Sequence, residues 1–171
     1  GSLIGGRSVV MLAVCKCKCI ASLAFCKLYL WSRSVEKMKH QRSDCPISCS
    51  LDAWGDKWSL LIIRDLMFAK QCTYGDFLKS PEGIATNILA ARLKALEENG
   101  LIEKLKHPES KAKVLYRLTP KGIDLLPMMI EINLWAEKYY TIAADRMAML
   151  KEVKKDKVGF IKAGMKELRR A

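Results

Sequence analysis

The segment from residue 83 to residue 122, GIATNILAARLKALEENGLIEKLKHPESKAKVLYRLTPKG, restricts the fold of this chain more than any other part of it. Leu89, Leu93 and Leu96 recur at helical spacing, so one face of the first half is apolar. The residues on its other faces are small, polar or basic. Gly100 follows, and a glycine just past the last turn supplies the left-handed conformation that stops a helix. The first half is therefore predicted to be an amphipathic helix.

The second half of the segment predicts a β-hairpin. Hydropathy alternates over residues 101–106 and again over residues 114–118, as expected of half-buried strands. The turn signal His-Pro-Glu-Ser lies between them at residues 107–110, with Lys111 and Lys113 beside it. The second strand is expected to place three apolar side chains on one face: Val114, Tyr116 and Leu118.

The residues before this segment predict two further helices. Asp56 is a good N-cap for a helix over residues 57–69, and residues 73–76 have the form of a capping box that opens a short helix. A break at residues 79–83 comes before the amphipathic helix. Helix, short helix, turn, helix and hairpin is the order of a winged helix-turn-helix. The predicted fold class is thus mainly α with a small β-hairpin wing, or α+β.

This order of elements suggests a partner as well as a fold. An α-helix fits the major groove of B-DNA, and a basic hairpin beside it can contact phosphates. An amphipathic helix and a hairpin can equally do no more than build a core. The pattern alone leaves both interpretations open.

A combination of residues between positions 45 and 141 stands in the order and spacing of a known family. They are Cys45, Pro46, Leu51, Asp52, Gly55, Lys57, Trp58, residues 60–66, Tyr74, Phe77, Leu78, Gly83, Ile84, Leu89, Arg92, Leu93, Leu96, Glu97, Gly100, Leu101, Ile102, residues 116–119, Gly122, residues 125–127 and Trp135. On these residues the chain resembles the HxlR-type transcriptional regulators, a winged-helix family related to the MarR group. Two residues depart from the family pattern. Ala85 replaces a serine, so that hydroxyl would have to come from Thr86, and Leu115 replaces an acidic residue.

The resemblance implies a homodimeric regulator of transcription that binds double-stranded DNA at an inverted-repeat operator and carries no cofactor. Thr86 and Asn87 are expected near base edges, and Arg92 and Lys94 at phosphates or in support of the helix face. The wing is expected to contact phosphates through Lys111 and Lys113. The full set of predicted DNA-binding residues is Thr86, Asn87, Ala90, Arg92, Lys94, Lys111, Lys113 and Arg117.

Net charge agrees with an anionic partner only locally. The chain carries a formal charge of +12, but residues 44–142 hold 13 basic and 13 acidic residues, and the excess lies at the two ends. Within residues 84–121, eight basic residues stand against four glutamates. That local excess, and not the high pI, is the relevant signal for a phosphate-binding surface.

The C-terminal part predicts a dimer. Thr119 is a good N-cap with Pro120 in the first helical position, and Pro127 should kink the helix or start a second one. Apolar residues then surround most of residues 128–140, and a small domain cannot cover such a helix alone. Residues 142–153, with Met147 and Leu150, are expected to continue this surface, and residues 159–171 to fray. The predicted dimer interface consists of Met128, Ile132, Trp135 and Tyr139.

The chain has seven cysteines, so a metal site and a redox-active thiol both have to be considered. Cys15, Cys17 and Cys19 lack downstream partners at zinc-finger spacing, so no metal site is predicted. Cys45 matches the cysteine that redox-responsive members of the family use, and the positive end of a helix can favour a reactive thiolate. Cys49 and Cys72 are alternative resolving thiols. Cys45 is either a sensor or a residue that only places the first helix, and the signal is an oxidant or a small molecule.

Domain boundaries are predicted at residues 37 and 141. Residues 1–37 comprise a cloning scar and an atypical basic and apolar extension, which is either an overlong gene start or an unusual native segment. Its apolar runs, separated by Lys16 and Lys18, are shorter than the roughly 20 residues of a membrane span. A membrane-surface helix is the alternative. Residues 38–141 form the DNA-binding domain and residues 142–171 a basic helical extension. The expected location is the cytoplasm, away from any membrane.

Motifs for catalysis are missing from the sequence. His40 and His107 are the only histidines, and no phosphate-binding glycine loop, nucleophile elbow or paired-histidine metal motif occurs. The chain is therefore not expected to be an enzyme. The alternative function is a winged-helix module for protein interaction or dimerisation that does not bind DNA.

Overall fold

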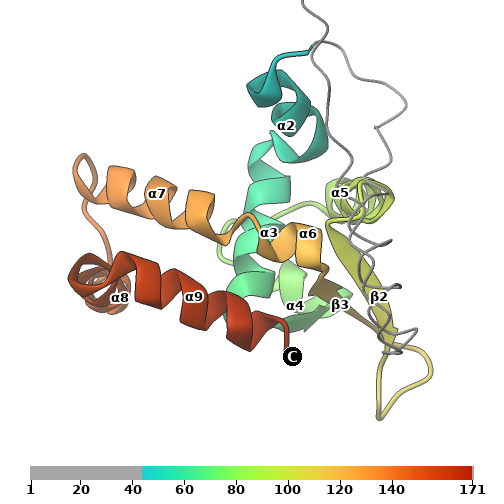
Figure 1. Ribbon diagram of the computed structural model, residues 1–171. Coiled ribbons are helices and arrows are strands. Elements are labelled where there is room, and N and C mark those ends of the chain that lie inside the picture. The colour runs from blue at the N-terminus through green and yellow to red at the C-terminus, as the bar shows by residue number, and fades with distance from the viewer. Residues whose placement is uncertain (1–43, 171) are drawn as a thin grey trace, which may run out of the picture. The chain divides into compact units, whose positions relative to one another are not determined.

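Alternating helices and short strands make up the computed structural model, which describes residues 44–170, all within the unit Met38–Ala171. The predictions for residues 1–37, including Cys15, Cys17 and Cys19, fall outside the described residues. Figure 1 shows the elements in chain order, and their bounds are α2 (Pro46–Trp54), α3 (Lys57–Ala69), β1 (Gln71–Thr73), α4 (Tyr74–Leu78), α5 (Thr86–Glu98), β2 (Ile102–Lys106), β3 (Val114–Leu118), α6 (Pro120–Ile123), α7 (Leu126–Glu137), α8 (Ala144–Lys155) and α9 (Lys157–Leu168).

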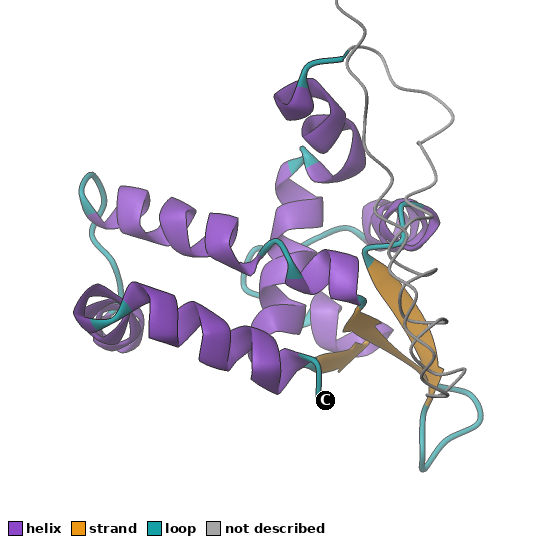
Figure 2. Ribbon diagram, in the orientation of Figure 1, coloured by secondary structure: helices purple, strands orange, loops and turns teal. Residues whose placement is uncertain are grey.

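The strands form one three-stranded antiparallel sheet in the order β1-β3-β2. Ile102 pairs with Leu118 and Lys106 with Val114, which confirms the hairpin. The sequence pattern missed β1, whose Gln71 pairs with Arg117. A strand of three residues is too short to show alternation. In Figure 2 the β2–β3 hairpin extends away from the helices as a wing.

The core lies between α3, α5 and one face of the sheet. Leu89, Leu93 and Leu96 of α5 are at most 3% exposed and belong to the same buried cluster as residues of α3 and β3. Val114, Tyr116 and Leu118 share one face of β3 as predicted. Tyr116 and Leu118 are buried, whereas the Val114 side chain is 39% exposed. Val114 opens the strand next to the wing turn, where no element covers it.

Helix-capping interactions occur at the predicted residues. The Asp56 carboxylate accepts hydrogen bonds from the backbone N–H groups of Trp58 at 3.0 Å and Ser59 at 3.1 Å, and it caps α3. Thr73 and Asp76 form the predicted capping box of α4. Each interaction satisfies N–H groups that a helix start leaves without partners.

Gly100 ends α5 in the left-handed region, with φ of +67°. Its N–H donates to the Glu97 carbonyl, and the N–H of Leu101 donates to the Leu96 carbonyl, both at 2.9 Å. This pair of bonds is a Schellman motif. It confirms the predicted glycine stop and directs the chain from α5 straight into β2.

The C-terminal helices correct two predictions. Pro127 lies at the start of a second helix, α7. This is one of the two outcomes that the sequence predicts, the other being a kink in a single helix. Leu150 and Val153 of α8, however, are almost fully buried within the chain and do not extend an outer surface. The expected fraying is also wrong, since α9 is a helix whose Met165 and Leu168 pack against both buried clusters. Helical spacing shows that such side chains are covered but cannot show which element covers them.

Ion pairs connect α9 and its C-terminal end to the rest of the unit. Lys70 at the end of α3 pairs with Glu167 at 2.7 Å, Arg169 pairs with Asp124 at 3.3 Å, and Lys157 pairs with Glu131 at 2.7 Å. Figure 1 shows α7 and α9 running side by side. Among residues 44–170, no helix combines the length and apolar character that crossing a bilayer requires.

Gly122 allows α6 to approach the backbone of Leu101, the residue just before β2. A Cβ at this position would lie 2.2 Å from the Leu101 carbonyl oxygen, a backbone atom that cannot move aside easily. We expect Gly122→Ala to lower the free energy of unfolding by about 1–3 kcal/mol, the usual cost of overpacking. Urea denaturation measures this difference.

Gly75→Ala is the matched control, because a Cβ there meets only the Thr73 hydroxyl oxygen at 3.9 Å. Equal stability of the Gly122→Ala and Gly75→Ala proteins would contradict the close approach of α6 to Leu101.

Candidate nucleic-acid interface

The outward face of α5 is opposite its buried leucines. Thr86, Asn87 and Ala90 are all exposed near the start of the helix. Ala85 occupies the N-cap position and no side chain caps the helix, so Thr86 does not supply the hydroxyl cap that the family serine would provide. The first turn of α5 therefore presents small and polar groups to solvent.

Tyr74 fixes the start of α5 relative to α4. Its hydroxyl donates a hydrogen bond to the Thr86 carbonyl oxygen at 2.7 Å. A hollow of about 480 Å³ opens beside it, lined by residues of α4 and of the wing, including Lys79, His107 and Lys113. The sequence around Tyr74 does not predict this role, because nothing in the local pattern indicates a contact twelve residues away.

A cluster around Arg64 holds the turn between α4 and α5. The Arg64 guanidinium pairs with both carboxylate oxygens of Glu82 and also contacts Asp65 at 2.7 Å and the Ser80 hydroxyl at 3.3 Å. Hydrogen bonds from Arg64 and then from Ser80 lower the pKa of the Glu82 carboxyl to about 2. A charged side chain of α3 thus bonds to the turn that leads into α5 and fixes its position.

Three of the predicted DNA-binding cations are already paired. Arg92 lies 3.2 Å from Asp56, the cap of α3. Its Nε is buried and makes no hydrogen bond of good geometry, so this contact is an ion pair and not a directed bond. In addition, Lys94 lies 3.8 Å from Glu98, and Arg117 lies 2.7 Å from its cross-strand partner Glu103.

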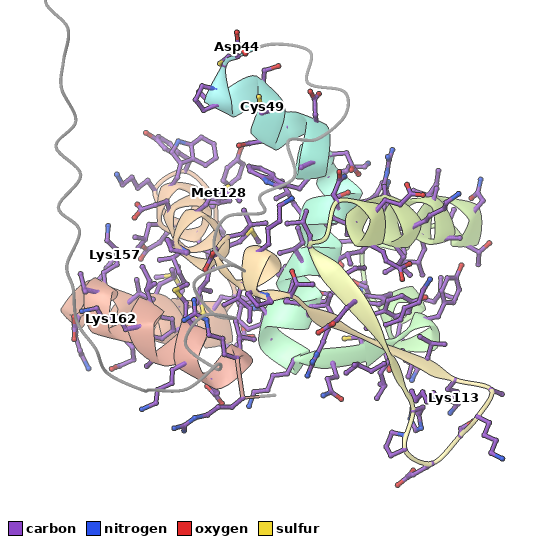
Figure 3. All side chains as sticks on the ribbon, turned by 45° about the vertical axis from the view of Figure 1, so that its right-hand side comes forward. Asp44, Cys49, Lys113, Met128, Lys157 and Lys162 are labelled. Atoms are coloured by element: carbon purple, nitrogen blue, oxygen red, sulfur yellow. The ribbon has the colours of Figure 1, made fainter. Side chains whose placement is uncertain are left out.

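Lys111 and Lys113 differ from these three residues. Both are exposed next to the wing turn, and neither forms an ion pair within residues 44–170. In Figure 3, Lys113 lies on the wing. The structure therefore brings Thr86, Asn87 and Ala90 together on α5 and leaves two unpaired lysines on the hairpin beside it.

Three of the predicted dimer residues lie on α7 and Tyr139 follows its end, and three of the four face solvent. Ile132 is 42% exposed, Trp135 53% and Tyr139 66%, while Met128 is half-buried. Trp135 stacks against Tyr139 with ring centroids 5.1 Å apart. The opposite side of α7 is covered, because Leu126 and Ile130 are buried together with Val153 of α8.

The cysteines of the described part differ in accessibility. Cys45 is exposed at the N-cap of α2, Cys49 is half-buried in the same helix, and Cys72 is buried in β1. Burial, followed by the charges of Asp65 and Asp76, raises the pKa of the Cys72 thiol to about 11. Cys72 is therefore a poor resolving thiol, contrary to one of the two options that the sequence left open.

Comparison with known proteins gives a consistent picture. The model of a family described as HxlR-like helix-turn-helix matches residues 53–143, just over half of the chain. The chain is 36% identical over 89 residues to the uncharacterized HTH-type transcriptional regulator sll1512 of a Synechocystis strain. That match covers 52% of this chain and 65% of the relative, so the chain spans just under two thirds of its length.

Two solved structures are also similar. PA1607, described as a candidate transcription factor, is 42% identical, with a TM-score of 0.54 over 61% of this chain and 72% of that chain. The redox regulator HypR in its oxidized form is 25% identical, with a TM-score of 0.51 over 57% of this chain and all of that chain.

The Arg64–Glu82 pair generates a prediction about pH. The pKa of Glu82 is lower in the folded state than its usual value near 4.3, so the pair stabilises the fold above that pH and less as pH falls towards 2. Glu82→Gln should therefore lower stability at pH 7. The difference from the unmodified protein should shrink below about pH 4.3, where the unmodified protein also loses the ionised carboxylate. Urea unfolding at pH 7, 4, 3 and about 2.5 measures the trend.

Glu109→Gln is the control, because Glu109 is exposed at the wing turn and has no ion pair among the described residues. A stability difference for Glu82→Gln that stays constant over the whole pH range would contradict the role of this ion pair.

Proposed function

The chain belongs to the HxlR-like helix-turn-helix family of transcriptional regulators, and from this premise we propose that it binds double-stranded DNA in a sequence-specific way. The observation that carries the proposal is the exposed start of α5 together with a wing whose Lys111 and Lys113 form no ion pair with any other described residue. A helix and a hairpin placed in this way can enter a major groove and contact the flanking phosphates. The family and its relatives are transcriptional regulators and not enzymes. We propose the cytoplasm as the location of this activity.

The proposed contacts divide into base readout and phosphate contacts. Asn87 is the side chain of the exposed α5 face best suited to read a base, since an amide can form two hydrogen bonds with adenine. Thr86 and Ala90 lie beside it and allow close approach. Lys111 and Lys113 contact phosphates. Arg92, Lys94 and Arg117 have acidic partners in the protein, so we assign Arg92 to support of α5 and the other two to secondary phosphate contacts.

The two classes of contact predict different mutant behaviour. Asn87→Ala should relax the preference at one base pair by about 1–3 kcal/mol, whereas changing Lys111 and Lys113 to Gln should weaken binding to every duplex. The double lysine variant should also reduce the slope of log affinity against log salt by about one unit per lost contact. Selection of duplexes from a random pool, followed by titration at several salt concentrations, measures both effects.

Lys162→Gln is the matched control, because Lys162 is exposed on α9, on a different part of the unit from the wing that carries Lys113 (Figure 3). If the unmodified protein enriched no duplex at moderate salt, the DNA-binding proposal would fail. The family fold would then be assigned to protein interaction or dimerisation alone.

The assembly that we propose is a two-fold symmetric homodimer through the outer face of α7. Ile132, Trp135 and Tyr139 form an exposed apolar stripe, and α2 adds Ile47 and Leu51, which are 70% and 49% exposed. Burial of such a stripe against its own copy is favourable, and a two-fold axis is the usual symmetry of such pairs. The operator is then an inverted repeat whose half-sites lie one helical turn of DNA apart or a multiple of it.

Trp135→Ala should weaken this dimer. A buried tryptophan at the centre of an interface often contributes 2 kcal/mol or more, so the dimer dissociation constant should rise roughly 30-fold or more. Val158→Ala is the control, because Val158 is an equally exposed apolar side chain on α9, at 61%. Sedimentation equilibrium measures both constants. A monomeric unmodified protein at micromolar concentration, with and without DNA, would exclude the dimer.

We further propose that Cys45 receives an oxidant or electrophile signal. It is exposed at the start of α2, and the similar HypR structure is described as a redox regulator. A disulfide to a thiol of the second copy would change the spacing of the two α5 helices, which must enter successive major grooves together. Diamide should therefore lower DNA affinity in the unmodified protein and much less in Cys45→Ser. Equal responses would make Cys45 a structural residue and point to a small-molecule ligand.

A further inference from the structure

The hollow between α4 and the wing arises because β1 is shorter than the strand beside it. β1 ends at Thr73, which pairs with Leu115, and α4 begins at the next residue. The strand β3 begins one residue beyond that pair, at Val114, and Lys113 and the wing turn precede it. β1 has no residue opposite Val114, and the space left between α4 and the wing is the hollow of about 480 Å³.

Two contacts fix the walls of this hollow and connect it to α5. The rings of Phe77 on α4 and Tyr116 on β3 meet edge to face, with centroids 6.1 Å apart. Tyr74 also lines the hollow, and its hydroxyl donates to the carbonyl oxygen of Thr86, the first residue of α5. A group bound in the hollow is therefore held at a fixed place relative to the exposed first turn of α5.

Each wall of the hollow carries a lysine. Lys113 comes from the wing and forms no ion pair with any other described residue, whereas Lys79 comes from the C-terminal end of α4. The Lys79 side chain is 80% exposed, and its ion pair with Asp76, at 3.1 Å, is of the exposed kind that a lysine exchanges at little cost. His107 adds a neutral donor, because its Nδ1 accepts the Glu109 N–H at 3.1 Å and its Nε2 therefore carries the hydrogen. The donors around the hollow thus favour an anion.

One acidic side chain, Asp76, lines the hollow as well. Its carboxylate accepts hydrogen bonds from the Thr73 hydroxyl at 2.6 Å and from the Thr73 N–H at 3.0 Å, so the capping box of α4 already occupies it. The two lysines exceed it by one positive charge, and the hollow is open to solvent. An open site with cations on two walls suits a charged strand that passes across it better than a small ligand, which proteins usually enclose.

We propose that this hollow holds the sugar-phosphate backbone of one DNA strand, with Lys79 on one phosphate and Lys113 on its neighbour. Lys79 is then a DNA-contacting residue that the helix-and-wing pattern of the sequence did not indicate. This inference rests on the proposed function and deepens it. A phosphate contact carries no base sequence but fixes the register and orientation of a protein on the duplex. Because Tyr74 joins the hollow to Thr86, the bound backbone sets where the first turn of α5 meets the base edges.

The test compares Lys79→Gln with Lys155→Gln in binding to the duplex selected by the unmodified protein. Lys155 is the matched control, because its side chain is 71% exposed on α8, pairs with an acid three residues earlier at 2.7 Å and does not line the hollow. Lys79→Gln should lower affinity for every duplex and reduce the slope of log affinity against log salt by about one unit, so its deficit should shrink about 3.5-fold between 50 and 200 mM salt. Lys155→Gln should change neither quantity, and Lys79→Arg should restore both.

The position of the backbone is tested with duplexes in which one phosphate at a time is replaced by an uncharged methylphosphonate. Lys79→Gln should become insensitive to one replacement and Lys113→Gln to another, and the two replaced phosphates should be adjacent on the same strand. Phosphates on opposite strands, or further apart on one strand, would overturn the shared hollow.

An unmodified protein that binds DNA while Lys79→Gln behaves like Lys155→Gln would overturn this inference alone. A loss of binding in Lys79→Arg as large as in Lys79→Gln, with thermal melts unchanged, would do the same, because the charge would then be irrelevant. An unmodified protein that binds no duplex would remove the proposed function and this inference with it.

Discussion

The burial of Leu89, Leu93 and Leu96 is the constraint on which the rest of this structure depends. These side chains fill the space between α3 and the sheet, so α5 cannot rotate about its axis without exposing them. The face that carries Asn87 and Ala90 is outward for that reason. The Schellman motif at Gly100 then sets where α5 ends and where β2, the first strand of the wing, begins. The outward placement of the proposed DNA-reading residues is therefore a consequence of core packing.

Several ion pairs within residues 44–170 connect one helix to another or to the turn before it. Arg64 holds the turn before α5, Arg92 joins α5 to the cap of α3, and several basic residues of α8 and α9 pair with acids of α7 and α6. Exposed ion pairs contribute only about 0–1 kcal/mol each, so a group such as Lys94 can exchange Glu98 for a phosphate at little cost. Lys111 and Lys113 of the wing would give up no ion pair with the described residues on binding a phosphate. Net charge over the whole chain says little about where DNA would bind.

The two C-terminal helices explain how a helix that is apolar on nearly all sides can exist at the surface. α8 and α9 cover one side of α7 through Val153 and Met165 and leave the stripe with Trp135 and Tyr139 exposed. The family match ends at residue 143, so α8 and α9 lie outside it. The number of apolar residues on α7 therefore overstates the apolar area that a partner could cover. Only the side of α7 that α8 and α9 do not contact is available to a partner.

Local chemistry explains why much of the fold could be predicted from the sequence. The caps at Asp56 and Thr73, the glycine stop at Gly100 and the helix start at Pro127 act within a few residues, so their patterns are visible in the chain itself. Tertiary structure alone decided the pairing of β1, the contact of Tyr74 with Thr86, the ion pair that engages Arg92 and the burial of Leu150 and Val153. Each of these joins residues far apart in sequence. Helical spacing shows that a side chain needs cover, but only the packed chain shows what covers it and which cations remain for DNA.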